Sequence, residues 1–419
     1  MRARRNTNNM KLTSRCNHLS ILLWTIHCII IFSQIPIAHS LTVAVFGGSG
    51  FLGRRICQTL VHEGHSVISV SKGGKPSPYY CNDNTGAGNS NWSDKVDWRS
   101  HCIHPTNVNE SEGTKTELSS SSPLLPSLVD DVSLELPPID AAISCIGNVN
   151  PAEEWDKLTF FGLAFDDTLL FQQNGLVNEC AAKIAKRSGA HRFVFLSVSY
   201  EVAKMLEGPI DGYMSGKRHA EQCIYDLFGD EGNSIVLGPS LMYGGNRFAS
   251  FGKLYSQVVR SPLAKGYVDG MNALRELSST PVEDWVEQSV FSPPVDVRTV
   301  ARVASSAALG LVSKDLVDSR KQNFFGYDGK PVSYADVVYI DGTEEIERID
   351  GLIDLSSASA VGVAVSPQER GQTCNREYER IEPLWEGALI GKGPFLYPFP
   401  VIGVFLAIFG AISTNQFVK

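Results

Sequence analysis

The chain has 419 residues, of which 43% are hydrophobic and 20% are charged, and its formal net charge is -8. This composition supplies enough apolar residues for a packed core and excludes a wholly disordered protein. The acidic balance argues against a nucleic-acid partner held through phosphate contacts. Nine cysteines without CxxC pairs argue against a zinc module and a dense disulfide framework.

Residues 1–40 are typical of a targeting segment. Basic residues from Arg2 to Arg15 precede an apolar run from Ile21 to Phe32, and no acidic residue occurs before Glu63. Read from Met10, the segment has the three parts of a secretory signal, with small residues near its end. An uncleaved anchor and a mitochondrial presequence are the alternatives, and in each case the segment lies outside the folded domain.

The next stretch predicts a βαβ unit. Leu41–Phe46 (LTVAVF) is a continuous β-branched run typical of a buried parallel strand. A glycine-rich turn follows at Gly47–Gly53, then a helical pattern over Arg54–Glu63 and a strand over His65–Ser71. Residues 76–94 and 106–123 are rich in Ser, Asn, Gly and Pro, so we expect two surface insertions on either side of a short strand.

Strands and helices alternate again in the second part of the chain. The expected strands are Asp140–Gly147, Arg192–Ser197 and Ser234–Leu237, and the expected helices are Asn174–Ser188, Lys217–Phe228 and Val300–Leu309. This alternation predicts an α/β fold with a doubly wound parallel sheet. Residues 310–392 form a C-terminal extension without a clear pattern.

The last residues, 393–419, form an apolar tail. No charged residue occurs from Gly393 to Val418, but three prolines confine any straight helix to the part after Pro400. About 17 residues remain, which is the lower limit for crossing a bilayer. A membrane-embedded tail and a helix packed against the domain are both consistent with this sequence.

The glycine turn, Gly47-Gly48-Ser49-Gly50-Phe51-Leu52-Gly53, predicts a dinucleotide site. Gly47 permits the tight turn, Gly50 allows backbone amides to approach a diphosphate, and Gly53 lets the helix pack on the sheet. A turn kept for packing alone is the alternative. The second strand ends at Ser71-Lys72 without the acidic residue that NAD sites usually carry, which favours NADP(H) over NAD.

A Tyr-x-x-x-Lys pair, Tyr213 and Lys217, lies at the start of an expected helix. The spacing places both side chains on one helical face. We expect the ammonium group to lower the pKa of the phenol, so that Tyr213 can act as a general acid and base.

Together these segments resemble the short-chain dehydrogenase/reductase superfamily, in its extended and atypical branches. The resemblance rests on VAVFGGSGFLG, DAAISCIG, RFVFLS, YMSGK, IVLGPSLMYG and PPVDVRTVARVA, and it covers about Leu41 to Leu309. It is strongest with the branch of the nucleotide-binding accessory subunit of respiratory complex I, which also holds a fungal coenzyme Q biosynthesis accessory protein and plastid relatives.

The resemblance implies a Rossmann-type NAD(P)-binding domain over residues 41–309 and assigns roles within it. Tyr213 is the implied general acid and base, and Lys217 also holds the nicotinamide ribose. Ser197 is the first candidate for polarising a substrate carbonyl, with Ser199 second, although the register could place Val198 there. The implied cofactor-binding residues are Gly47, Gly50, Phe51, Leu52, Gly53, Ser71, Lys72, Cys145, Ile146, Gly147, Lys217, Pro239 and Ser240.

Three functions follow as expectations. The first is an NADP(H)-dependent oxidoreductase that acts on a quinone or another apolar membrane substrate. The second is a non-catalytic, nucleotide-bound accessory subunit or assembly factor of a membrane complex, and the third and weakest is a sugar-nucleotide epimerase or dehydratase. The resemblance implies a mitochondrial, membrane-associated location, whereas the signal-like N-terminus favours entry to the ER or a plastid. The nine histidines form no HExxH pattern, so no metal is expected.

Overall fold

The computed structural model describes residues 40–77, 92–103, 106–107, 129–130, 134–148, 166–206, 210–229, 233–244, 249–277, 292–317, 324–325, 331–332 and 337–361. The chain divides into two units, Met1–Ser40 and Leu41–Lys419. Residues 1–39 of the expected targeting segment, most of both expected insertions and the apolar tail lie outside the described residues.

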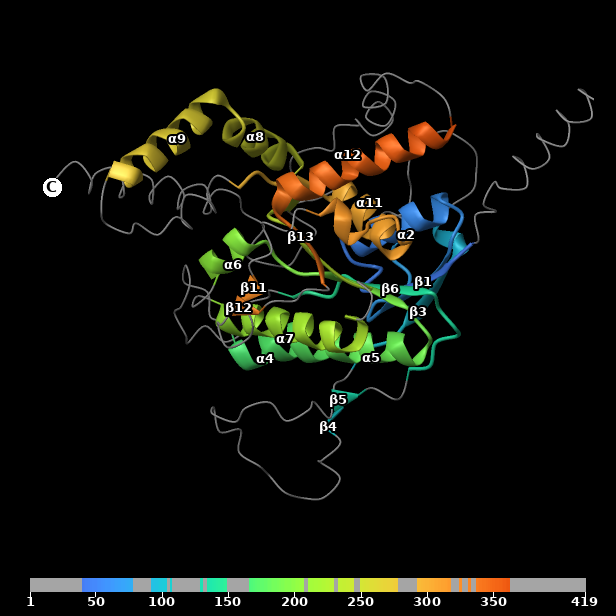
Figure 1. Cartoon of the computed structure of the whole chain (residues 1–419). Helices are drawn as coiled ribbons and strands as arrows, with labels where there is room; N and C mark the ends of the chain where they lie inside the picture. The colour runs from blue at the N-terminus through green and yellow to red at the C-terminus, as the bar shows by residue number, and fades with distance from the viewer. Residues whose placement is uncertain are drawn as a thin grey trace, which may run out of the picture. The chain divides into compact units, whose positions relative to one another are not determined.

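A seven-stranded parallel sheet forms the centre of the second unit (Figure 1). The strand order is β13-β8-β7-β6-β1-β2-β3. Because the chain moves outward from β1 in one direction to β3 and then in the other direction from β6 to β13, the sheet is doubly wound. The fold is of the Rossmann type, which confirms the prediction. The strands are β1 (Thr42–Phe46), β2 (Ser66–Ser71), β3 (Val96–Ser100), β6 (Ala141–Ser144), β7 (Arg192–Leu196), β8 (Ser234–Gly238) and β13 (Val338–Asp341).

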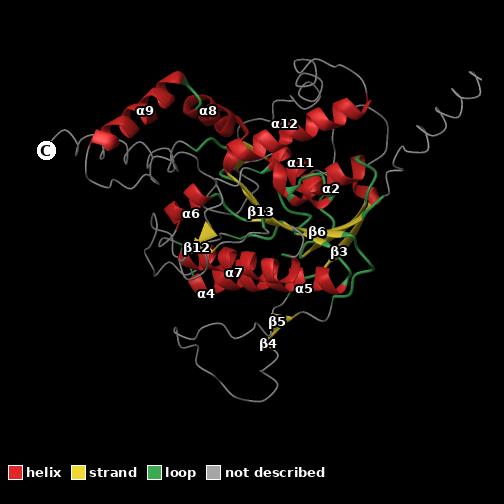
Figure 2. Ribbon diagram, viewed as in Figure 1, coloured by secondary structure: helices red, strands yellow, loops and turns green. Residues whose placement is uncertain are grey.

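Helices cover both faces of this sheet (Figure 2). One face carries α2 (Gly53–His62), α11 (Val297–Ala308) and α12 (Gly342–Val361). The other carries α4 (Asp167–Phe171), the π-helical segment η4 (Gln172–Leu176), α5 (Val177–Arg187) and α7 (Asp211–Phe228).

The core follows from the alternation of side chains along the strands. Val43 and Val45 of β1 belong to the apolar cluster beneath α2, α11 and α12. Ala44 and Phe46 belong to the cluster beneath α5 and α7. Both faces of β1 are therefore apolar, which explains why the strand reads as a continuous hydrophobic run rather than an alternating one.

The remaining helices and strands of the described residues complete the list. They are η1 (Trp92–Lys95), β4 (Thr106–Asn107), β5 (Val129–Asp130), α6 (Tyr200–Leu206), β9 (Met242–Tyr243), α8 (Ala249–Val259), α9 (Pro262–Leu277), β10 (Val295–Asp296), η6 (Lys314–Leu316), β11 (Phe324–Phe325) and β12 (Pro331–Val332). None of the helices in the described part of the chain has the length and apolar character to cross a membrane.

The structure differs from the sequence expectations mainly in the C-terminal half. The sheet continues past residue 309, because Val338 and Ile340 of β13 pair with Ile235 and Leu237 of β8. The helix expected over Asn174–Ser188 begins earlier, at Asp167, and passes through the π-helical segment before α5.

Candidate nucleotide-binding site

The glycine turn joins the carboxyl end of β1 to the first residue of α2. Gly47 has a φ of +81°, and its amide donates to the carbonyl of Val70 on β2 at 2.7 Å. The amide of Gly50 donates to the carbonyl of Gly47 at 2.9 Å, which closes the turn. A Cβ atom on Gly53 would lie 2.2 Å from that same carbonyl oxygen, so only glycine fits where the helix begins.

The amino end of α2 faces this turn without a side-chain cap among the described residues. Leu52 is the N-cap residue, and its side chain makes no capping hydrogen bond. No acidic residue occurs in the first turn, which instead contains Arg54 and Arg55. The amides of Arg54 and Arg55 donate within the turn, to the carbonyls of Gly50 at 3.1 Å and Leu52 at 2.9 Å. The positive end of the helix dipole favours an anion at this position.

A second wall of the site follows β6. The amide of Cys145 donates to the carbonyl of Phe46 at 2.9 Å, and a Cβ atom on Gly47 would lie 3.2 Å from the carbonyl carbon of Cys145. The two loops are therefore in backbone contact, at the place where the strand order reverses. Burial raises the pKa of the Cys145 thiol to about 12, so this thiol is not a nucleophile at neutral pH.

The tip of β2 forms the outer rim. The hydroxyl of Ser71 donates to the carbonyl of Gly74 at 3.3 Å, and Ser100 donates to the carbonyl of Lys72 at 3.1 Å. These bonds fix the backbone of the tip, while the side chain of Lys72 is exposed. The segment from Ser71 to Lys75 contains no carboxylate.

The side chain of Lys217 extends from α7 to the ends of two strands. Its ammonium group donates to the carbonyls of Ile146 at 3.0 Å and Leu196 at 2.9 Å, and it lies 5.8 Å from the ring centre of Tyr213. Lys217 is only 3% exposed, and burial lowers its pKa to about 8. The structure thus brings Tyr213, Lys217 and the loop that contains Ile146 and Gly147 together.

Tyr213 lies in an apolar environment. It is 9% exposed and shares a cluster with Leu170, Val198 and Met214. Burial raises the pKa of the phenol above its ordinary value, which is the opposite direction to the shift expected from a neighbouring ammonium group. Lys217 is sequestered by two carbonyls instead.

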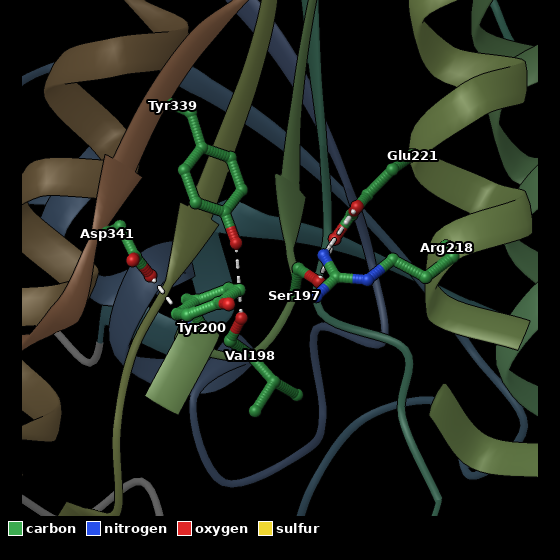
Figure 3. Close-up of polar contacts among 7 residues, drawn as sticks. All are labelled: Ser197, Val198, Tyr200, Arg218, Glu221, Tyr339 and Asp341. Carbon is green, nitrogen blue, oxygen red and sulfur yellow. Dashed lines mark hydrogen bonds and ion pairs between the residues drawn. The ribbon is translucent and has the colours of Figure 1, made fainter. Parts of the chain in front are cut away.

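The residues that follow β7 have different surroundings, and Figure 3 shows that the side chains of Ser197 and Val198 point in different directions. The hydroxyl of Ser197 donates to the carboxylate of Glu221 on α7, within a buried network. The side chain of Val198 is in the cluster of Tyr213, whereas the Ser199 hydroxyl is buried and has no hydrogen-bond partner among the described residues. Val198 therefore contributes to the apolar surroundings of Tyr213, and of the two serines Ser199 is the one whose hydroxyl has no partner in the described part of the chain.

The network around Ser197 connects α7 to β13 (Figure 3). Arg218 donates to Glu221 at 3.0 Å, and the hydroxyl of Tyr339 on β13 donates to the carbonyl of Val198 at 3.2 Å. A Cβ atom on Gly238 would lie 2.9 Å from this hydroxyl, so glycine at that position makes room for Tyr339. The hydroxyl of Tyr339 thus lies where a side chain at position 238 would begin.

Pro239 and Ser240 follow β8 and anchor neighbouring loops. The carbonyl of Pro239 accepts from the amide of Ser199 at 3.1 Å, and the hydroxyl of Ser240 donates to the carbonyl of Pro293 at 2.7 Å. The side-chain hydroxyl of Ser240 therefore serves the protein's own backbone.

Asn174 is a site residue that sequence reasoning missed. It is buried in the π-helical segment, its amide nitrogen donates to the carbonyl of Asn148 at 2.8 Å, and its amide oxygen accepts from the backbone amide of Asn148 at 2.9 Å. It thereby fixes the loop that lies over Lys217. A π-helical turn has no distinct hydrophobic periodicity, but a polar residue on the buried face of a predicted helix is a usable signal.

Two glycines let α7 approach this segment closely. A Cβ atom on Gly216 would lie 3.0 Å from the amide nitrogen of Gly175, and one on Gly212 would lie 2.0 Å from the carbonyl oxygen of Asp167. Because these glycines are next to Tyr213 and Lys217 in the sequence, the close backbone packing sets the position of both side chains.

Comparisons with known proteins leave the family open. No family model matches the chain. An uncharacterized chloroplastic protein of Arabidopsis thaliana is 26% identical over 266 residues, which are 63% of this chain and 70% of that protein. MIOREX complex component 2 of Saccharomyces cerevisiae is 47% identical over 55 residues, which are 13% of this chain and 18% of that protein.

The similar solved structures are distant. MoeE5 in complex with UDP-glucose and NAD has 15% identity and a TM-score of 0.35, over 74% of this chain and 81% of that chain. The UDP-Glc/GlcNAc 4-epimerase from Campylobacter jejuni has 10% identity and a TM-score of 0.36, over 74% of this chain and 84% of that chain. At these scores the assignment of the fold rests on the strand order of this chain alone.

Proposed function

We propose that this chain binds a nicotinamide dinucleotide at the carboxyl ends of β1, β2 and β6, in the manner of short-chain dehydrogenases/reductases. The observation that carries the proposal is the turn Gly47–Gly53, in which Gly53 has no space for a side chain and Gly47 contacts the loop after β6. A turn kept for packing alone would not need an uncapped helix end directed at the same place.

The residues present fit each part of such a ligand. Backbone amides of the turn and of Phe51 and Leu52 suit the diphosphate, while Cys145, Ile146 and Gly147 line the side toward the nicotinamide. Exposed Lys72, at a strand tip without a carboxylate, suits a ribose 2′-phosphate, so we propose a preference for NADP(H).

When bound, a nicotinamide supplies hydride chemistry. Reduction of a carbonyl substrate would also require a proton donor and a group that polarises the carbonyl. Tyr213 is the candidate proton donor, and the buried hydroxyl of Ser199, which has no hydrogen-bond partner among the described residues, is the remaining candidate for polarising the carbonyl. Val198 lies in the cluster of Tyr213, and the Ser197 hydroxyl is occupied by Glu221. Removing one such polarising group typically costs about 10²–10³ in rate.

We therefore favour a nucleotide-bound protein in which the ligand serves assembly or sensing, as an accessory subunit or assembly factor of a membrane complex. The second candidate, an NADP(H)-dependent oxidoreductase of an apolar substrate, draws support from the proximity of Tyr213 and Lys217, whose ammonium group is 5.8 Å from the phenol ring centre. Association with a membrane and location in an organelle stay predictions, since both terminal segments lie outside the described residues.

One set of experiments separates these functions. The full-length protein is purified in mild detergent, the copurifying nucleotide is identified by mass spectrometry, and NADPH oxidation is followed with short-chain quinones and with UDP-sugars. The accessory role predicts a bound nucleotide, no turnover, and normal complex assembly in cells that carry Tyr213→Phe. Turnover that Tyr213→Phe abolishes would establish the oxidoreductase instead, and absence of any nucleotide together with failure to bind added NADPH or NADH would refute both.

A further inference from the structure

Three potential metal ligands converge between α5 and α7, on the face of the sheet that these helices cover (Figure 1). Glu179 lies on α5, and His219 and Cys223 lie one turn apart on α7. One ligand atom from each residue lies within 4.8 Å of the other two. None of the three belongs to the nucleotide site.

The contacts centre on a single nitrogen atom. Nε2 of His219 lies 2.7 Å from Oε2 of Glu179 and 3.6 Å from Sγ of Cys223. A proton relay from a thiol through an imidazole to a carboxylate would use both ring nitrogens. Here both partners face the same nitrogen, which fits ligands arranged around a common point and does not fit a nucleophilic triad.

The surroundings also oppose a reactive cysteine. Cys223 is partly buried, and its sulfur lies within 4.8 Å of a carboxylate oxygen of Glu179. A neighbouring carboxylate does not favour a thiolate, so these surroundings are unlike those of a nucleophilic cysteine. A bound cation would offset the negative charge of the thiolate and of the carboxylate, with the thiol proton released to solvent.

The two carboxylate oxygens of Glu179 have different neighbours. Lys183 contacts Oε1 at 2.8 Å, while Oε2 faces His219. The Glu179 side chain is 1% exposed and that of His219 is 20% exposed, so the cluster is buried on one side and reachable from solvent on the other. The ring of Phe171 lies 5.4 Å from that of His219 and limits the positions of the imidazole.

We propose that Glu179, His219 and Cys223 bind a divalent transition-metal ion, with Zn²⁺ as the best match. One thiolate, one imidazole and one carboxylate are a typical zinc ligand set, whereas Mg²⁺ and Ca²⁺ prefer oxygen ligands alone. Three protein ligands leave a fourth position for water or another ligand. The site joins α5 to α7, which contains Tyr213 and Lys217.

The test uses the purified full-length protein, stripped with a chelator and titrated with Zn²⁺, with Co²⁺ as a spectroscopic probe and Mg²⁺ as a comparison ion. Cys223→Ala and His219→Gln remove one ligand each. Cys180→Ala is the matched control, because Cys180 is the buried cysteine next to Glu179 on α5. Circular dichroism verifies that each variant is folded, and a variant that fails this check is replaced by Cys223→Ser or His219→Asn.

The proposal predicts one Zn²⁺ per chain, a sulfur-to-cobalt charge-transfer band with Co²⁺, and no comparable affinity for Mg²⁺. It predicts that Cys223→Ala abolishes the band and that each ligand variant weakens Zn²⁺ binding by at least about 100-fold, since even changes outside the ligand set cost 10–100-fold. Cys180→Ala should leave both unchanged. Failure of the folded protein to bind Zn²⁺, or binding that survives in folded Cys223→Ala and His219→Gln, would overturn the proposal.

Discussion

The substitution Gly53→Ala tests whether the turn Gly47–Gly53 needs glycine at its last position. The new Cβ atom would lie 2.2 Å from the Gly47 carbonyl oxygen and 2.7 Å from Cα of Gly48, both of which are backbone atoms. The turn has to move by roughly 1 Å to relieve this overlap, and overpacking of this kind typically costs about 1–3 kcal/mol. Better helix propensity returns at most about 1 kcal/mol. We therefore expect a net loss of about 1–2 kcal/mol of stability, equivalent to a fall in Tm of about 2–8 °C.

The assay combines thermal unfolding with calorimetric titration of NADPH. Displacement of the Gly47 carbonyl and the adjoining amides should weaken NADPH binding at least about tenfold, which corresponds to about 1.4 kcal/mol. Gly351→Ala in α12 is the matched control, because a Cβ atom there meets nothing within 4 Å. It should raise stability by about 0.5–1 kcal/mol and leave NADPH binding unchanged. Unaltered stability and NADPH affinity in Gly53→Ala would refute the reasoning, and lowered stability with intact affinity would show that the nucleotide binds elsewhere.

Three further predictions address other parts of the site. Lys72→Glu should weaken NADPH binding by about 10–100-fold, which corresponds to the loss of a charge-assisted contact of about 1.5–3 kcal/mol. NADH binding should be nearly unchanged in the same titration. Equal effects on both nucleotides would contradict the proposed contact of Lys72 with a 2′-phosphate. Glu221→Leu leaves Arg218 buried without its carboxylate and should cost about 3–5 kcal/mol in denaturant unfolding, whereas the double variant with Arg218→Met should recover part of this loss; additive losses would argue against a coupled pair. Burial lowers the pKa of Lys217 to about 8 from 10.5, so between these pH values the folded state binds fewer protons than the unfolded state, and this group makes stability rise from pH 8 to pH 10. Lys217→Met should flatten that rise relative to wild type. An unchanged slope would contradict the lowered pKa of Lys217.

The first βαβ unit could be predicted closely from the sequence because its signals are local. Val43 to Phe46 are buried on both faces of the sheet, so the run is apolar without interruption. The glycines that follow are required because larger side chains would clash with the backbone of the turn. The predicted strand begins one residue before β1 and ends at the same residue, and the predicted helix begins and ends one residue after α2.

The C-terminal part of the sheet could not be predicted in this way. β13 is a four-residue strand, and its sheet partner among the described residues, β8, lies about a hundred residues earlier in the chain. Short strands of this kind are defined by their pairing partners rather than by local pattern. The contact of Tyr339 with Val198 and its closeness to Gly238 depend on that pairing, so the explanation for glycine at position 238 becomes visible only in the folded chain.

The sequence also could not predict which residue after β7 faces Tyr213. Ser197, Val198 and Ser199 follow the strand directly, and a shift of one residue decides which side chain meets Tyr213. Asn174 and the cluster of Glu179, His219 and Cys223 were missed for a different reason. The spacing of His219 and Cys223 was readable as one helical turn, but a search restricted to histidine pairs does not detect a mixed pair that a second helix completes.

Binding of the nucleotide itself is the most direct test of the account. Isothermal titration calorimetry of the folded full-length protein, freed of any copurified nucleotide, should detect one NADPH per chain and weaker binding of NADH. A competing titration with 2′-phospho-ADP-ribose should reduce the NADPH signal, because the same turn and the same strand tip would hold the shared part of both molecules. Absence of any heat of binding with either dinucleotide at saturating concentration, confirmed by equilibrium dialysis, would contradict the proposed function.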